Sequence, residues 1–150
     1  MLNKHHKNIA TFIHLSTFTR FFIPFGNFIG PIVLWVTNKD RSDFIDSNGK
    51  QAINFQLSIL LYTFIIGLLT VPFFVFKLLG CFNFIDFNGF ENLHISMGKP
   101  SPLLYLGGFL GVLAFIGFII ELVLIIVASL KAQNGEVYQY PLTINFLKTY

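Results

Sequence analysis

Two long apolar stretches dominate the hydrophobic pattern of the chain. The stretch from Ala52 to Phe76 carries no charged residue over 25 positions, and the stretch from Leu103 to Leu130 carries one charge over 28 positions. As helices they would measure about 37 and 42 Å, against a hydrocarbon core of roughly 30 Å. Lipid excludes unpaired backbone, and both stretches are too long and too uninterrupted for barrel strands. We therefore predict that segments 52–76 and 103–130 cross a membrane as helices.

A third apolar stretch, from Ile9 to Val36, is broken near its middle. Pro24 and Pro31 each remove a helix hydrogen bond, and the sequence Phe-Gly-Asn at positions 25 to 27 is typical of a turn. The pattern allows either one kinked helix or a helical hairpin of segments at about 9–23 and 24–38. Each half offers about 15 residues, fewer than the roughly 17 that a full crossing needs, so a hairpin would be shallow or re-entrant.

The positions of lysine and arginine distinguish these two arrangements. With a hairpin, seven cations of the water-facing segments lie on one side of the membrane and two on the other, whereas a single crossing divides them five to four. Cytoplasmic loops are enriched in lysine and arginine, so the distribution favours the hairpin. The prediction is an all-helical integral membrane protein with one domain over residues 1–150. It is multi-pass in the bacterial inner membrane, with both termini and the tail 131–150 cytoplasmic and the loop 77–102 extracytoplasmic.

The composition agrees with a membrane location. Charged residues make up only 11% of the chain, whereas a soluble domain carries about 25%. The net charge of +3 comes from scattered cations and not from a basic stripe with exposed aromatic residues, which argues against nucleic acid as a partner. The predicted partners are the lipid bilayer and, within it, a second copy of the chain or other membrane proteins.

Polar residues inside the apolar segments define a candidate intramembrane site at Glu121, Asn54, Gln56 and His14. Glu121 lies about 15 Å from the predicted cytoplasmic end of its helix, where an ionised carboxylate is costly unless it is paired or hydrated. Arg20 is the only cation in an apolar segment that can reach it. We expect a neutral acid, hydrogen-bonded to Asn54, Gln56 or His14, and a silent Glu121→Gln substitution. The alternative is a carboxylate that binds protons or cations in transit.

Glycine pairs provide the candidate helix-packing residues. Gly107 and Gly111 form one G-x-x-x-G pattern, and Gly26 and Gly30 form another. Glycines at this spacing lie on one face of a helix and let a neighbouring backbone approach closely. We expect both pairs to mark contact faces.

The polar segment that precedes Ala52 contains Lys39, Asp40, Asp46, Gly49 and Lys50. Its acids lack the spacing of a calcium-binding loop, so we expect a solvated loop in which Asp46 or Asn48 caps the next helix. The sequence contains no Ser-His-acid combination, carboxylate pair, phosphate-binding glycine loop or zinc-ligand spacing. We therefore expect no enzyme activity, metal or cofactor.

Several runs of residues resemble a bacterial family, the domain of unknown function 4870. They include I-P-F-G-N at 23–27, G-K-Q-A-I-N-F-Q at 49–56 and K-A-x-N-G-E-x-Y-x-Y-P at 131–141. That family is similar to the channel-forming Tic component of the chloroplast inner-envelope import machinery. The resemblance covers roughly residues 8–148 and implies a small multi-spanning membrane protein, without an established activity.

The function predicted from the sequence is that of a non-enzymatic membrane protein that packs with itself or with partner membrane proteins. The alternative is a translocation or ion-conducting component in which Glu121 and the broken N-terminal segment line a path. Fold does not imply function, so the resemblance does not choose between them.

Overall fold

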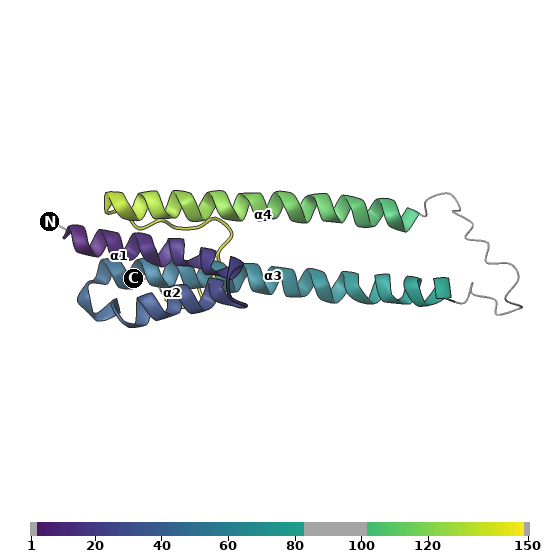
Figure 1. Ribbon diagram of the computed structural model, residues 1–150, viewed down its shortest axis with the longest axis horizontal. Helices are drawn as coiled ribbons and strands as arrows, with labels where there is room; N and C mark the ends of the chain where they lie inside the picture. Colours follow the sequence, from purple (N-terminus) through teal and green to yellow (C-terminus); the bar gives the residue numbers. More distant parts are fainter. Residues whose placement is uncertain (1–2, 83–101, 149–150) are drawn as a thin grey trace, which may run out of the picture. The chain divides into compact units, whose positions relative to one another are not determined.

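The computed structural model describes residues 3–82 and 102–148 (Figure 1). Its elements, in chain order, are α1 (Lys4–Leu15), the 3₁₀ helix η1 (Ser16–Phe21), α2 (Gly26–Val36), the 3₁₀ helix η2 (Lys39–Arg41), α3 (Asp43–Phe82) and α4 (Pro102–Asn134). All regular structure within the described residues is helical, which confirms the predicted all-helical class. The spans Asp43–Pro72 of α3 and Tyr105–Asn134 of α4 are long and apolar enough to cross a membrane.

The chain forms two compact units. One comprises Met1–Leu61 with Phe118–Tyr150, and the other comprises Tyr62–Gly117. In the second unit many of the described side chains are apolar and exposed, among them Phe64, Leu69, Phe109 and Phe115. Exposed apolar surface on this scale is typical of a lipid-facing or protein-facing helix.

In the first unit the N-terminal segment folds as a hairpin and not as one kinked helix. Figure 1 shows α1 and α2 running in opposite directions, and η1 lies between them. The chain reverses at Phe25, whose φ of 58° is in the left-handed region, just before α2 begins at Gly26. Thr19 joins the two arms, because its Oγ1 lies 2.7 Å from the carbonyl oxygen of Ser16 and 2.6 Å from that of Gly26.

Helix α3 begins nine residues before the predicted start at 52, so the expected solvated loop is wrong from Asp43 onward. The backbone of Ser42 is extended, and it separates η2 from α3. The Ser42 Oγ accepts a hydrogen bond of 3.2 Å from Phe44 N in the first turn of α3. Asp46 and Asn48 therefore lie inside the helix and do not cap it. Phe44, Ile45 and Asn48 are buried, and their spacing places them on one face of the helix. At its other end α3 continues to Phe82, into the predicted loop 77–102, and residues 83–101 of that loop lie outside the described residues.

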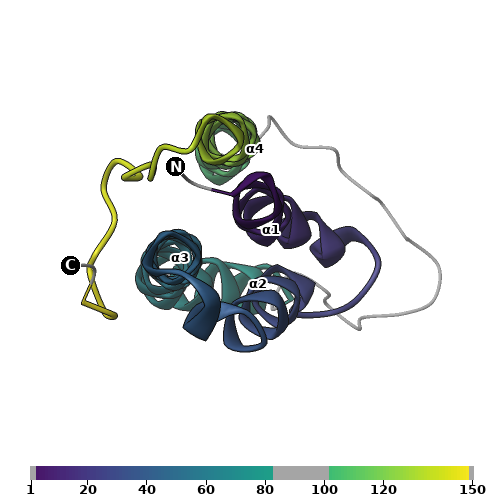
Figure 2. The same cartoon turned by 90° about the vertical axis from the view of Figure 1, so that its left-hand side faces the viewer.

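Alanines allow the helices of the first unit to approach closely. Ala10 of α1 and Ala132 of α4 pack with Phe44 of α3, and Ala128 packs in a second cluster around Phe55 and Ile125. The α4 helix ends at Asn134, and Gly135 follows it with a φ of 90°. Glu136 N donates to Lys131 O over 2.9 Å, as in a Schellman motif. The tail after Gly135 then runs from the end of α4 to the side of α3 (Figure 2).

Candidate functional site

Glu121 lies at the centre of a polar network in the first unit. It is 6% exposed in α4, and its carboxylate forms an ion pair with the guanidinium of Arg20 from η1. The side chain of Arg20 is 28% exposed, and its Cζ lies 5.8 Å from the ring centroid of Phe118, a cation–π distance. An arginine is always charged in proteins, so a carboxylate is the partner that compensates it at lowest cost.

Two amides extend this ion pair across the hairpin. Gln56 of α3 donates from Nε2 to Glu121 Oε1 over 3.5 Å, and Asn27 of α2 donates from Nδ2 to Gln56 Oε1 over 2.9 Å. The resulting chain, Asn27–Gln56–Glu121–Arg20, takes one residue from each of α2, α3, α4 and η1. We call it the four-element network. It fixes the hairpin against both long helices.

Arg20, the one cation of an apolar segment that was expected to be within reach, lies against Glu121. The neutral state expected for this acid stays a prediction. Of the three hydrogen-bond partners considered for this carboxylate, the structure brings Gln56 to it, whereas Asn54 and His14 bond elsewhere. The 3₁₀ conformation of η1 advances the backbone by about 2.0 Å per residue, more than an α-helix does. Arg20 therefore lies further from the start of the hairpin than it would in a continuous α-helix. Sequence reasoning assigned Asn27 only to the turn and missed its place in the network.

His14 belongs to a second buried chain of hydrogen bonds. Asn48 Nδ2 donates to Phe44 O over 2.8 Å, so its Oδ1 is left as an acceptor 3.0 Å from His14 Nε2. The proton of a neutral His14 therefore sits on Nε2, and Nδ1 accepts from the Tyr140 hydroxyl over 2.9 Å. Burial raises the pKa of Tyr140, which keeps this hydroxyl a donor. The chain connects α1, α3 and the tail.

Asn54 anchors the tail to α3. Its Nδ2 donates to Leu147 O and its Oδ1 accepts from Leu147 N, both over 2.8 Å, so the amide side chain pairs with the backbone as a neighbouring strand would. One turn further, Ser58 Oγ accepts from Ile144 N over 2.8 Å. The Tyr140 ring stacks on Phe55 at a centroid distance of 4.0 Å. Asn54 therefore has a structural role in positioning the tail.

The glycines of the two G-x-x-x-G patterns have different surroundings. A Cβ on Gly26 would lie closer than 3.0 Å to backbone atoms of Thr19, and one on Gly30 would lie as close to Ser16 O. Gly26 and Gly30 thus form the face on which α2 contacts η1. A Cβ on Gly111 would meet nothing within 4 Å, and the packing face predicted for Gly107 and Gly111 stays a prediction.

The residues of the segment before Ala52 surround Trp35 at the end of the hairpin. Trp35 Nε1 donates to Asp46 Oδ1 over 2.8 Å, Asp46 pairs with Lys50 over 2.6 Å, and Lys39 Nζ lies 5.8 Å from the indole centroid. Gly49 has no room for a side chain, because the indole occupies the position of its Cβ. Asp40 lines an open polar pocket of about 680 Å³ beside these groups. Over residues 3–82 and 102–148, no three or more His, Cys, Asp or Glu side chains gather in a group that could hold a metal ion.

These features define a helical protein with two spans long and apolar enough to cross a membrane, in which buried polar residues connect separate helices. Residues 5–147 match the family model of the magnetosome magnetite crystal formation proteins, MamF/MmsF, and the chain belongs to that family. No curated protein and no solved structure matches the chain. The resemblance to the domain of unknown function 4870 and to the Tic component is therefore wrong, because the family match assigns the same stretch of chain to the magnetosome proteins.

Proposed function

We propose that this protein is an integral component of the magnetosome membrane and acts in magnetite crystal formation without catalysing a reaction. The family match over residues 5–147 carries the proposal. Two helical spans of membrane length and their exposed apolar side chains support insertion into the bilayer. The magnetosome membrane replaces the inner membrane as the proposed location.

Packing, and not transport, is the mode of action that we propose. The Glu121 carboxylate already accepts from Arg20 and Gln56, and Gln56 accepts from Asn27, so these polar groups satisfy one another. A satisfied network favours one rigid arrangement of the helices over a path for ions. The rigid unit then presents its apolar helices to lipid and to partner membrane proteins. Both termini and η2 face the cytoplasm in this arrangement.

Complementation tests the proposed role. The chain is expressed in a magnetite-forming bacterium from which its own members of this family have been deleted, and crystal lengths are measured by electron microscopy. We expect the chain to restore crystal length and an exposed-charge control, Lys131→Gln, to restore it equally. Glu121→Gln should restore it less, because it breaks the network. Unchanged crystals in cells whose magnetosome membranes contain the chain at normal levels would contradict the proposal.

A further inference from the structure

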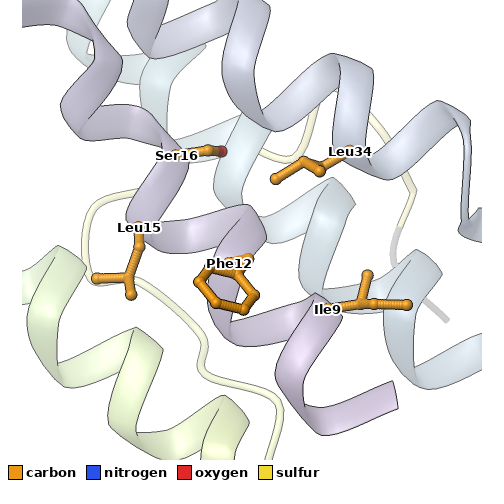
Figure 3. A pocket seen from close by; sticks show the side chains of 5 residues that line it. All are labelled: Ile9, Phe12, Leu15, Ser16 and Leu34. Carbon is orange, nitrogen blue, oxygen red and sulfur yellow. The ribbon is translucent and has the colours of Figure 1, made fainter. Parts of the chain in front are cut away.

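An apolar groove runs along the hairpin of the first unit (Figure 3). Its volume is about 350 Å³, and it is lined by Ile9, Phe12, Leu15, Ser16 and Leu34. Four of these side chains are hydrocarbon, and the hydroxyl of Ser16 donates to Ile13 O over 2.6 Å. The groove therefore offers no free hydrogen-bond donor and suits an apolar chain.

A cationic contact lies one helical turn from this groove. Arg41 of η2 donates from Nη1 to His5 Nε2 over 3.3 Å, and His5 precedes Ile9 by four residues, on the same face of α1. Among the described residues, the ion pairs are those of Arg20, Lys50 and Lys131, and Arg41 is in none of them. Its planar guanidinium has donors that match a phosphate group.

The segments at the start of α1 and around η2 carry a net positive charge. Lys4 and Lys7 lie in the first turn of α1, and Lys39 lies beside Arg41 in η2. The acids on this side of the chain are Asp40 and Asp43, since Asp46 is paired with Lys50. These segments therefore hold four cations, Arg41 included, and two acids outside an ion pair, an excess of positive charge that attracts an anionic group.

We propose that the groove binds one anionic phospholipid, with an acyl chain along Ile9, Phe12 and Leu34 and the phosphate at Arg41 and His5. The groove volume of about 350 Å³ is small for a helix of a second copy, whose diameter is about 10–12 Å. A free phosphate ion would gain nothing from the apolar lining. The inference requires insertion into a bilayer, but it does not depend on a role in crystal formation.

The single tryptophan of the chain reports on the occupant. Trp35 packs with Ile9 and Leu34 against the same buried cluster, formed by Ile13, Ile45 and Ala52. The full chain is reconstituted in phosphatidylcholine liposomes that contain a small fraction of lipid brominated on its acyl chains, either phosphatidylglycerol or phosphatidylcholine. Bromine quenches indole fluorescence on contact. We expect an apparent affinity about fivefold higher for the brominated phosphatidylglycerol, as a basic residue near an anionic headgroup supplies.

Three variants separate the parts of this site. Arg41→Gln should remove the preference for phosphatidylglycerol, whereas Lys131→Gln, which removes an equal charge from α4, should keep it. Phe12→Gln changes a side chain that is 58% exposed, so the fold should survive while quenching by both lipids falls. Circular dichroism confirms folding of each variant. Equal quenching by the two lipids in the parent, a preference that survives Arg41→Gln, or quenching unaffected by Phe12→Gln would each overturn the assignment.

Discussion

Glu121→Gln should destabilise the protein by about 3 kcal/mol, the lower end of the cost of breaking a buried ion pair. The amide keeps the shape of the side chain but leaves the charge of Arg20 uncompensated beside α4. We take the lower end because the side chain of Arg20 is 28% exposed and retains some solvent. In detergent the melting temperature should fall by about 6–12 °C, at the usual scale of 2–4 °C per kcal/mol for a chain of this size.

A double substitution identifies the cause of this loss. Removing both charges with Arg20→Gln and Glu121→Gln should recover part of the stability, because no charge is then left unpaired. The matched control is Lys131→Gln, which breaks the pair with Glu136 whose side chains are 46% and 57% exposed, and should have little effect. An unchanged melting temperature for Glu121→Gln alone would show that the ion pair contributes nothing to stability and would support the prediction of a neutral acid.

Gly26→Ala should also be strongly destabilising, by about 2–3 kcal/mol, the upper part of the range for overpacked sites. The added methyl group would overlap backbone atoms of Thr19, which cannot move aside as a flexible side chain can. Gly111→Ala is the control, because its methyl group meets nothing within 4 Å. It should stabilise the helix by about 0.5–1 kcal/mol, since alanine loses less backbone entropy than glycine.

Thermal unfolding of both variants in mild detergent measures the difference. Opposite signs would show that the hairpin depends on close approach at Gly26 and that a methyl group at Gly111 is accommodated without a clash. Equal melting temperatures would remove the argument for a packed face at Gly26.

The helical class followed from the two long apolar runs, but the start of α3 did not follow from them. Asn48 and Gln51 read as polar loop residues, yet both are buried. Asn48 is satisfied by His14, which is 34 residues away in sequence. Hydrophobic periodicity cannot reveal a helix face whose buried positions are polar and paired by distant residues. The boundary therefore depended on tertiary contacts.

The site was found in part for a similar reason. Glu121 and Gln56 stood out because each interrupts an apolar segment. Arg20 was recognised as the one cation within reach of Glu121, although the two residues are 101 positions apart. Asn27 as the partner of Gln56 and Tyr140 as the partner of His14 were not recognised, because these pairs are 29 and 126 positions apart. Motif runs led to the wrong family, although a membrane protein is what the family match also supports.

The central claim is that the N-terminal segment enters the membrane as a hairpin and returns to the side from which it came. Single cysteines at positions 4, 39, 88 and 148, in a Cys81→Ser background, are probed with an impermeant thiol reagent in a bacterial host that lacks magnetosomes. Positions 4, 39 and 148 should react only after the cells are permeabilised, and position 88, which lies outside the described residues, should react in intact cells. Labelling of positions 4 and 88 but not 39 in intact cells would contradict the hairpin and indicate a single crossing.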